Sequence, residues 1–432
     1  ENAMPTLPHT GTDIPKKRPL LILVLFCLMA FSFMDRQMIP ALLEPMKRDL
    51  AFSDVQMGLI QSVFMVCIAL FAAPVSLLVD RWSRRKCTGI MAILWSAMAV
   101  LTGVFSNFVL LLGARGLSGC AQSAYKPAAI AWISTMMPAD SRSRYVGILN
   151  MALPLGAALG TMGAGILAQV TGDWRLAFYF MPLPGIVLGL CCFFLPDYTA
   201  ARSGEATARS PLQDWIYLLR KKTFVFASLA SAAFTFGGFA LLGWTPALYS
   251  RQYGLSEAEA GILIGVFLVV SALGSIGGGW LSDWFHKKSP CGRAIASLVA
   301  ACGMFAMRGT YLAALYYQVP LPVAITLGIL DCIIGYSWIP TNDVLLQDPV
   351  PPYLRASAFG LAYLLIYLLG AAWGPSIVGL ISDSYGGGVD GVLHGFMLTM
   401  PVVFLCPVFQ AAIIKTYIKD IADVDEASAS QQ

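Results

Sequence analysis

Two charged residues lie side by side in an apolar stretch of this sequence, where their charge has to be compensated. Asp35 and Arg36 are adjacent in LLILVLFCLMAFSFMDRQMIPALLEPM, which runs from Leu20 to Met46. A charge at the centre of a bilayer costs about 2.5–3.5 kcal/mol on insertion scales. Burial disfavours the charged form of a carboxyl group, whereas a neighbouring cation favours it, so a buried Asp-Arg pair is suited to exchanging a proton. We therefore interpret Asp35 as a candidate proton carrier.

A second set of polar residues is spaced to share one helix face. Arg115, Gln122 and Lys126 are separated by seven and four residues, so in a helix they point the same way. Inside a bilayer such a face is expected to turn toward a water-filled cavity. With Arg36 it gives three cations against Asp35, and this excess predicts an anionic ligand, a carboxylate or a phosphate. Alternatively, Arg115 forms a structural ion pair with Asp35, and Lys126 pairs locally or extends to the membrane surface.

Polar and aromatic side chains in the second half of the chain are further candidates for a binding pocket. The stretch LDCIIGYSWIPTND spans residues 330–343, and its Asp331 is a second candidate for proton coupling. As a group these side chains form a wall that is apolar and can also donate hydrogen bonds; the alternative is that the aromatic residues only anchor or pack the helices. The predicted substrate-binding residues are Arg36, Arg115, Gln122, Tyr125, Lys126, Tyr336, Trp338, Asn342 and Tyr367.

Membrane-spanning helices are the elements that must position these residues. Of the 432 residues, 57% are hydrophobic and 12% are charged, whereas soluble domains carry about 25% charged residues. About 20 apolar residues cross a bilayer as a helix, which predicts an all-α membrane protein with twelve spans. The expected spans are 20–43, 55–79, 87–106, 108–137, 145–170, 174–195, 223–250, 257–282, 292–313, 319–347, 354–382 and 391–418.

The longest polar connection divides the spans into two sets of six. We expect an N-terminal tail (1–19), a first six-helix bundle (20–195), a linker (196–222), a second six-helix bundle (223–418) and a C-terminal tail (419–432). In this arrangement most of the 28 Lys and Arg residues fall in loops on one side of the membrane. Because Lys and Arg accumulate in cytoplasmic loops, both termini are predicted to be cytoplasmic.

The two halves repeat each other in sequence. GLIQSVF (58–64) pairs with GILIGVF (261–267) at an offset of 203 residues, and LGAALG (155–160) pairs with LGAAWG (369–374) at an offset of 214. Six helices per half place the repeats in parallel topology, with the substrate site near the membrane midplane between them. The small residues of the second pair let helix backbones approach closely, either as static packing or as a contact that slides during transport.

The loop between the second and third spans carries a family resemblance. SLLVDRWSRRK (76–86) resembles the Gly-x-x-x-Asp-Arg-x-Gly-Arg-Arg loop of the major facilitator superfamily, with Ser76 and Ser83 in place of the two glycines. GWLSDWFHKK (279–288) is its echo in the second half. The resemblance implies two six-helix bundles and a cytoplasmic gate whose charges bridge the halves; alternatively, the positive cluster only sets the membrane topology. The implied gate residues are Asp80, Arg81, Arg84, Asp283 and Lys287.

Two further stretches narrow the resemblance to the anion:cation symporter family and to bacterial Spinster-like transporters. Asp35-Arg36 and RGLSGCAQSAYKP (115–127) resemble the first and fourth spans of these relatives, and GAAWGPSIVGLISD (370–383) resembles the eleventh span of the Spinster-like proteins. The relatives use the Asp and a Glu as proton carriers. This chain departs from that pattern, because Gln122 stands where they carry the Glu.

Together these features predict a secondary active transporter that moves a small organic anion by alternating access and is coupled to protons through Asp35. The alternative is a Spinster-like transporter of lysophospholipids or sphingolipid-like amphiphiles; a receptor that binds without transport fits the matched halves less well. We expect no enzyme activity, cofactor or metal, because the sequence has neither a GxxxxGK[ST] nor an HExxH motif. The expected partners are the anionic substrate or lysolipid, protons and the bilayer.

Nucleic acid is not an expected partner, because the net charge of +4 is small and spread along the chain. The loops are short, with no large outer domain, and we predict a location in the bacterial inner membrane. We expect the protein to be a monomer.

Overall fold

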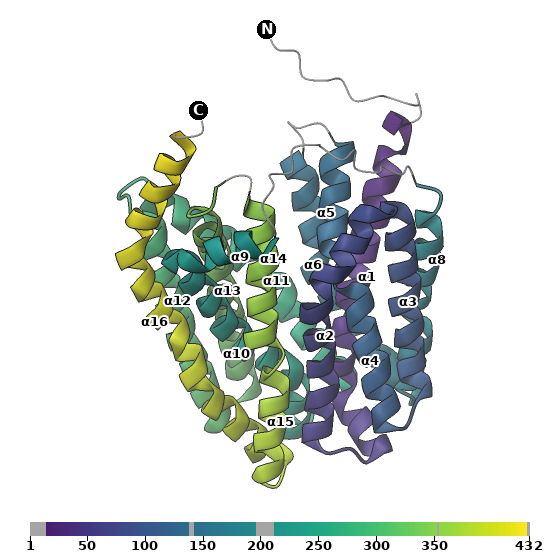
Figure 1. Cartoon of the computed structure of the whole chain (residues 1–432). Helices are drawn as coiled ribbons and strands as arrows, with labels where there is room; N and C mark the ends of the chain where they lie inside the picture. The colour runs from purple at the N-terminus through teal and green to yellow at the C-terminus, as the bar shows by residue number, and fades with distance from the viewer. Residues whose placement is uncertain (1–13, 138–141, 196–210, 352–353, 430–432) are drawn as a thin grey trace.

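The computed structural model describes residues 14–137, 142–195, 211–351 and 354–429, and this part of the chain is almost entirely helical, without strands (Figure 1). The first half comprises α1 (Ile14–Leu50), α2 (Asp54–Arg81), α3 (Arg84–Val104), α4 (Phe108–Gln122), α5 (Tyr125–Met136), α6 (Arg142–Thr171), α7 (Arg175–Phe180) and α8 (Leu183–Cys192). The second half comprises α10 (Lys222–Tyr253), α11 (Glu257–His286), α12 (Gly292–Tyr316), α13 (Leu321–Gln347), α14 (Arg355–Ile366), a π-helical turn (Tyr367–Ala371), α15 (Gly374–Ser384) and α16 (Gly388–Ala429).

The predicted all-α membrane fold is confirmed. Eleven helical stretches within the described residues are long and apolar enough to cross a membrane. The remaining predicted span, 108–137, is split into α4 and α5 at Ser123 and Ala124. Pro127 gives the physical reason, because it has no N–H to donate to the carbonyl of Ser123 and its ring clashes with that carbonyl in a regular helix.

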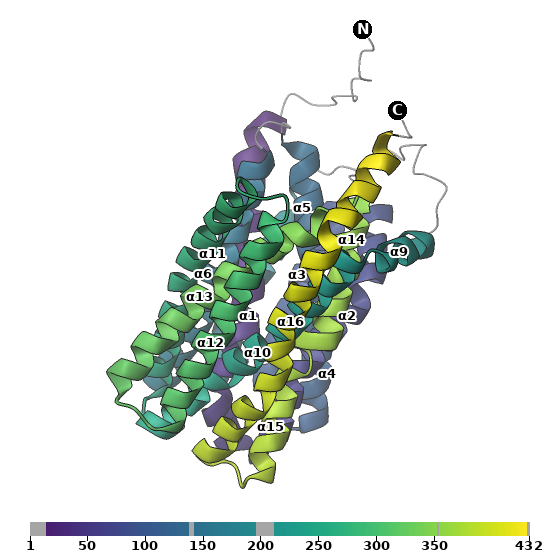
Figure 2. The ribbon, with the colours of Figure 1, turned by 90° about the vertical axis from the view of Figure 1, so that its left-hand side faces the viewer.

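The two halves stand side by side with their helices roughly parallel (Figure 1). α1 begins and α16 ends at the same end of the molecule, which we call the terminal face; the opposite end is the far face (Figures 1 and 2). The short helix α9 (Pro211–Arg220) lies near the terminal face and precedes α10.

Three boundaries differ from those expected from hydropathy. α1 already begins at Ile14, inside the predicted tail, and α16 continues to Ala429, eleven residues beyond the predicted last span. α9 lies within the predicted linker, of which 196–210 fall outside the described residues. A helix does not end where its apolar residues end, because Lys, Glu and Ala favour helix as strongly as Leu does.

The small-residue stretches pack each half around its first helix. In α6, Gly156 and Gly160 lie directly against the backbone of α1. At the equivalent positions in the second half, Gly370 and Gly374 lie against the backbone of α10. A Cβ at any of the four positions would clash with a backbone carbonyl, so these residues set how closely the helices approach.

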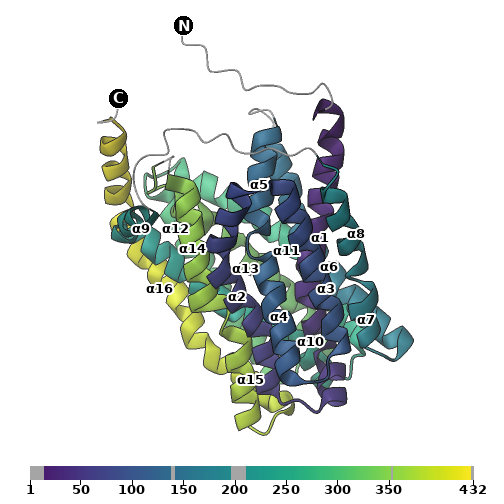
Figure 3. The same cartoon turned by 45° about the vertical axis from the view of Figure 1, so that its right-hand side comes forward.

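The last glycine of each stretch reaches the opposite half. Gly165 of α6 lies against the backbone of Glu257, the first residue of α11, and Gly379 of α15 lies against the backbone of Asp54, the first residue of α2. The two contacts are therefore related by the sequence repeat. They form two seams between the halves, α6 with α11 and α2 with α15, and Figure 3 shows α15 beside α2 at the far face.

The helices that enter the seams begin alike. Ser53 and Ser256 cap α2 and α11, each with a complete capping box that satisfies orphan backbone N–H groups. One turn later, Gly58 of α2 lies against the backbone of α15, and Gly261 of α11 lies against the backbone of α6. The repeat detected in the sequence is thus a pair of matching contacts in space.

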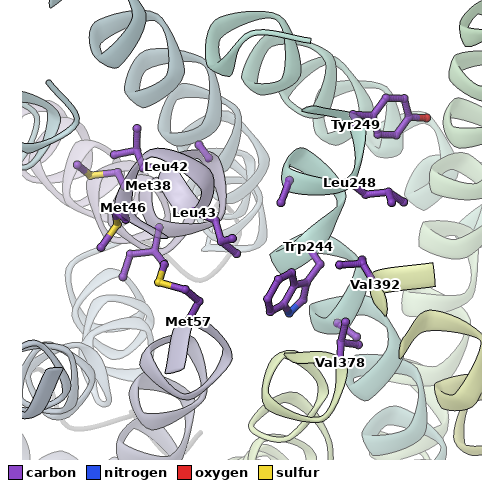
Figure 4. Packing of buried hydrophobic residues seen from close by; sticks show 14 of the residues in the cluster. Met38, Leu42, Leu43, Met46, Met57, Trp244, Leu248, Tyr249, Val378 and Val392 are labelled. Atoms are coloured by element: carbon purple, nitrogen blue, oxygen red, sulfur yellow. The ribbon is translucent and has the colours of Figure 1, made fainter. Parts of the chain in front are cut away.

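An apolar cluster shared by both halves closes the far face (Figure 4). In the first half, Met38, Leu42, Leu43 and Met46 come from α1 and Met57 from α2. In the second half, Trp244 and Leu248 come from α10, Val378 from α15 and Val392 from α16, and the Trp244 ring points toward the first half. All of these side chains are almost completely buried. Removing apolar surface from water stabilises such a contact by roughly 25 cal/mol per Å², so the halves are held together most firmly at this end.

Candidate functional site

Asp35 is buried on α1, and three side chains of α4 donate hydrogen bonds to its carboxylate. Arg115 Nη1 lies 3.0 Å from Oδ1, while Gln122 Nε2 and Ser118 Oγ lie 2.8 Å and 3.3 Å from Oδ2. The spacing of three and four residues puts these donors on one face of α4. Asp35 and Arg115 are each 2% exposed, so the ion pair considered as the alternative role of Arg115 is present.

Gln122 joins Asp35 to Arg36. Its Oε1 accepts a hydrogen bond from Arg36 Nε at 3.2 Å and another from Ser32 Oγ at 2.8 Å. Its Nε2 donates to Asp35 on the other side of the amide. The structure therefore brings Gln122 together with both members of the Asp-Arg pair.

A pocket lies between the two halves, and Arg36 and Arg115 line it. The Arg115 guanidinium lies 4.6 Å from the centroid of the Phe64 ring, and that of Arg36 lies 5.5 Å from it. An aromatic face attracts cations, so Phe64 helps to hold two like charges beside the pocket. The other lining residues, most of them apolar, are Gln37, Pro40, Gln61, Met65, Phe239, Leu242, Gly243 and Pro375.

Positive charge is in excess at this pocket. The carboxylate of Asp35 is occupied by Arg115 and by two uncharged donors. Arg36 is half-buried and donates through Nε; among the described residues its two terminal nitrogens have no hydrogen-bond partner. The buried Nε of Arg115 also lacks a partner there. An anion in the pocket would therefore meet guanidinium nitrogens that the protein leaves available.

Lys126 contacts the opposite half, on the terminal-face side of the pocket. Its Nζ lies 3.3 Å from the hydroxyl of Tyr363, and Tyr363 stacks on Tyr367 with ring centroids 5.7 Å apart. Asp343 of α13 attracts Lys126 electrostatically. Arg115 and Gln122 contact α1 instead, so the break between α4 and α5 separates side chains that a continuous helix would keep on one face.

Tyr125 follows the same break and is enclosed in the first half. Its hydroxyl donates to the backbone carbonyl of Leu25 at 2.7 Å, and its ring packs edge-on against Trp95 at 5.2 Å. Only 1% of Tyr125 is exposed. The side chain is directed into the core of the bundle, and the predicted contact between Tyr125 and substrate stays a prediction.

Asp331 belongs to a second buried ion pair. Arg308 Nε, on α12, lies 2.9 Å from both carboxylate oxygens of Asp331, on α13. Arg308 thus compensates this charge within the second half. The proton-coupling role predicted for Asp331 stays a prediction.

Two more predicted binding residues lie inside the second half. Asn342 donates to Ser231 Oγ at 2.7 Å and accepts from Gln410 Nε2 at 2.6 Å. Trp338 is 2% exposed and packs on Phe234 with ring centroids 4.8 Å apart. Both side chains face helices of their own half, so their predicted substrate contacts stay predictions.

Tyr336 and Tyr367 are half-buried, and they differ in their surroundings. Tyr336 lies in α13, close enough to Arg308 for an electrostatic interaction. Tyr367 begins the π-helical turn and packs against Phe239, a residue of the pocket wall, with ring centroids 6.4 Å apart. Tyr367 therefore contacts the pocket lining through Phe239.

The predicted gate residues lie where helices end at the terminal face. Arg84 is buried at the start of α3, and Asp283 and Lys287 are exposed at the end of α11. The side chains of Asp80 and Arg81 lie outside the described part of the structure. Their predicted bridging role stays a prediction.

Sequence reasoning missed a charged cluster that joins the halves at the far face. Arg251 of α10 donates through Nε to Glu44 of α1 at 2.7 Å, and through Nη1 and Nη2 to Asp54 of α2 at 3.2 Å and 3.0 Å. Asp54 is completely buried and also accepts hydrogen bonds from Lys47 and Ser382. We call Glu44, Lys47, Asp54, Arg251 and Ser382 the far-face latch.

Asp383 of α15 adds two further hydrogen bonds to the start of α2, where Asp54 lies. Asp383 Oδ1 and Oδ2 accept hydrogen bonds from the backbone N–H groups of Asp54 and Val55 at 3.0 Å and 2.9 Å. These N–H groups are orphans of the first turn of α2, where an anion is favoured. In the sequence, charges at the ends of apolar stretches look like ordinary loop residues. The repeat offset of 203 residues, which aligns Asp54 with Glu257, is a signal that could have pointed to this position.

Within the described residues, no group of three or more His, Cys, Asp or Glu side chains could hold a metal ion.

Comparison with known proteins places these observations in a family. Residues 25–375 match the profile of the Major Facilitator Superfamily. Protein spinster homolog 1 of Xenopus laevis is 30% identical over 401 residues, covering 87% of this chain and 75% of that protein. The sphingosine-1-phosphate transporter SPNS2 of Xenopus tropicalis is 27% identical, covering 82% of this chain and 71% of that protein.

A solved structure has the same fold. It is described as a bacterial homologue of the human lysosomal transporter Spinster, in an inward-facing and unoccupied conformation. Its TM-score is 0.84 at 22% sequence identity, covering 95% of this chain and 99% of that one. The predicted resemblance to Spinster-like transporters is thereby confirmed.

Proposed function

The chain belongs to the major facilitator superfamily, and we propose that it is a secondary transporter for a substrate with an anionic group, which it moves by alternating access between its two halves. One observation carries the proposal: the terminal nitrogens of Arg36 are available in a pocket between the halves, while Arg115 is already paired with Asp35. An Arg fork matches the oxygens of a carboxylate or phosphate. Such a group would compensate the excess positive charge.

Asp35 is proposed as the proton carrier. When ionised it holds Arg115 and Gln122 in place by accepting their hydrogen bonds. When protonated it loses its charge, and the two guanidiniums then attract an anion more strongly. Proton and anion would thus bind together, and they would be released together when Asp35 ionises on the other side of the membrane.

Two classes of substrate fit this site. A small organic anion would use Arg36 and Arg115 alone. An amphiphile such as a lysophospholipid or a sphingolipid-like molecule would place its head group there and its chain along apolar wall residues such as Phe239 and Leu242. The apolar wall favours the amphiphile, and so does the similarity to SPNS2, which is a sphingosine-1-phosphate transporter.

Transport in proteoliposomes tests the proposal and separates the two classes. We expect uptake of one labelled class, small carboxylates and sugar acids or lysolipids, and counterflow of that label after preloading. Arg36→Ala is expected to abolish it, because the available guanidinium is removed. If neither class shows counterflow, or if Arg36→Ala transports as well as the unsubstituted protein, the proposed site is wrong.

The distribution of Lys and Arg along the chain bears on its orientation in the membrane. We propose that the terminal face is cytoplasmic, that the protein is a monomer of the bacterial inner membrane, and that Asp80, Arg84 and Asp283 act at the cytoplasmic gate. The excess of Lys and Arg in the loops of that face supports this orientation. Labelling of single cysteines in intact cells from either side would test it.

A further inference from the structure

The amide of Gln122 is in contact with two oppositely charged side chains. Its Nε2 donates to Asp35 Oδ2 at 2.8 Å, and its Oε1 accepts from Arg36 Nε at 3.2 Å. Ser32 Oγ, at 2.8 Å, donates to the same Oε1. Gln122 is 2% exposed, so water does not compete for these hydrogen bonds.

The direction of the amide is determined by its partners. An ionised carboxylate can only accept hydrogen bonds, and a guanidinium can only donate them. Asp35 therefore requires the NH₂ end of Gln122, and Arg36 requires the carbonyl end. With the amide reversed, an oxygen would face the carboxylate and two donors would face each other, so a single orientation satisfies both partners.

This orientation determines how Arg36 is presented to the pocket. Gln122 holds Arg36 at Nε, which is one edge of the planar guanidinium. Phe33 packs against the guanidinium, 4.4 Å from its ring centroid. With one edge and one face occupied, the two terminal nitrogens remain as a pair, and such a pair binds two oxygens of one anion through parallel hydrogen bonds.

We propose that Gln122 is a positioning residue for the substrate anion. It does not touch the substrate; it orients Arg36 so that the terminal nitrogens form an end-on fork for an anionic group with at least two equivalent oxygens. This inference rests on the proposed function.

Two substitutions of Gln122 separate positioning from a merely structural role. Gln122→Leu removes the acceptor for Arg36 Nε and keeps a side chain of similar size. Gln122→Glu restores that acceptor, and when the introduced carboxyl is protonated it can also donate to Asp35 as the amide does. The charged groups that it faces are Asp35 and Arg36 of α1; Arg115 reaches the cluster through Asp35, and α2 contributes the uncharged Phe64 ring.

The first measurement is binding of benzenesulfonate and octanesulfonate to the full chain in lipid nanodiscs, at several pH values. Sulfonates stay ionised throughout, so a pH response belongs to the protein. We expect Gln122→Leu to weaken binding about tenfold at every pH, since an orienting hydrogen bond to a charged group is worth about 1.4 kcal/mol or more. We expect Gln122→Glu to bind within twofold of the unsubstituted protein at low pH and at least tenfold more weakly at high pH.

Gln252→Leu is the matched control. Its amide donates to the backbone carbonyl of Leu315 at 2.8 Å near the far face, away from Arg36. The same loss of an amide there is expected to change sulfonate binding less than twofold. Equal binding by Gln122→Leu and the unsubstituted protein would overturn the proposal.

A second measurement needs no ligand. In protein labelled with ¹⁵N-arginine, the Nε–H proton of Arg36, assigned by its absence in Arg36→Lys, is expected to exchange slowly with water and to exchange at least tenfold faster in Gln122→Leu. An unchanged exchange rate would overturn the positioning role. If exchange changes as expected but neither sulfonate binds the unsubstituted protein, the proposed anion site fails while the contact between Gln122 and Arg36 stands.

Discussion

Arg251 of α10 holds the carboxylate of Asp54, the first residue of α2, through two hydrogen bonds of 3.0 Å and 3.2 Å across the interface between the halves. Asp54 is completely buried, and Arg251 is bound to Glu44 as well. Leaving a buried charge without its partner costs about 3–5 kcal/mol. The far-face latch therefore stabilises the closed far face, and its hydrogen bonds have to break whenever that face opens.

Arg251→Met is expected to shift the protein toward conformations that are open at the far face. The substitution leaves Asp54 with Lys47 as its remaining cation, which weakens the closed state. Val109 and Tyr317 are exposed near the far face on opposite halves. Double electron–electron resonance between spin labels at these two positions should give a longer distance in Arg251→Met than in the unsubstituted protein.

The control for this prediction is Arg48→Met. Arg48 also pairs with the opposite half, through Glu257, but its side chain is 68% exposed, and exposed pairs contribute little. We expect an unchanged distance distribution for this control. A distribution for Arg251→Met that matches that of the control would show that the latch does not stabilise closure.

Asp35→Asn is expected to remove the response of transport to a pH gradient while exchange of substrate continues. One pH unit is worth about 1.4 kcal/mol, which is a tenfold accumulation for one coupled proton. Accumulation in proteoliposomes under an imposed gradient would measure the loss. Asp390→Asn, a substitution of an exposed carboxylate on α16, should accumulate substrate normally. Tenfold accumulation by Asp35→Asn would exclude Asp35 as the carrier.

Gly379→Ala and Gly165→Ala are expected to hinder closure of the far face. A Cβ at either position clashes with a backbone carbonyl of the opposite half, and overpacking costs about 1–3 kcal/mol. The spin-label distance should lengthen and uptake should slow. Gly277→Ala is the control, because a Cβ on Gly277 meets no atom within 4 Å. If all three variants give the same spin-label distance and the same uptake rate, close packing at the seams is not needed to close the far face.

Asp331→Asn tests whether the second buried ion pair is structural or carries a proton. It leaves the buried Arg308 without its counter-charge, and we expect a loss of about 3–5 kcal/mol in the free energy of unfolding. Replacing both partners, Arg308→Met with Asp331→Leu, should cost much less. Thermal unfolding measures the stability, and uptake under a pH gradient measures coupling. A stable double variant that has lost coupling would confirm the proton role predicted for Asp331.

Much of the site was predictable because the residues that form it lie on two regular helices. The face shared by Arg115 and Gln122 follows from a spacing of seven residues. Both donate to Asp35 on α1, and Gln122 also accepts from Arg36. Lys126 is different. The helix is interrupted at Ser123 and Ala124, ahead of Pro127, and the Lys126 side chain contacts Tyr363 instead. Extending one helix face along the sequence by residue spacing assumes an unbroken helix, so it misplaces Lys126 unless the effect of the proline is considered.

The sequence by itself determined the membrane-spanning class, the two-fold repeat and the excess of buried positive charge, because hydropathy, periodicity and residue type act locally along the chain. The tertiary structure decided which charges meet: Asp35 with Arg115, Asp331 with Arg308, and Asp54 with Arg251. Partners separated by up to 197 residues leave no local signal. Their pairing depends on the angle and depth at which whole helices pack, and close backbone contacts at residues such as Gly165 and Gly379 set that packing.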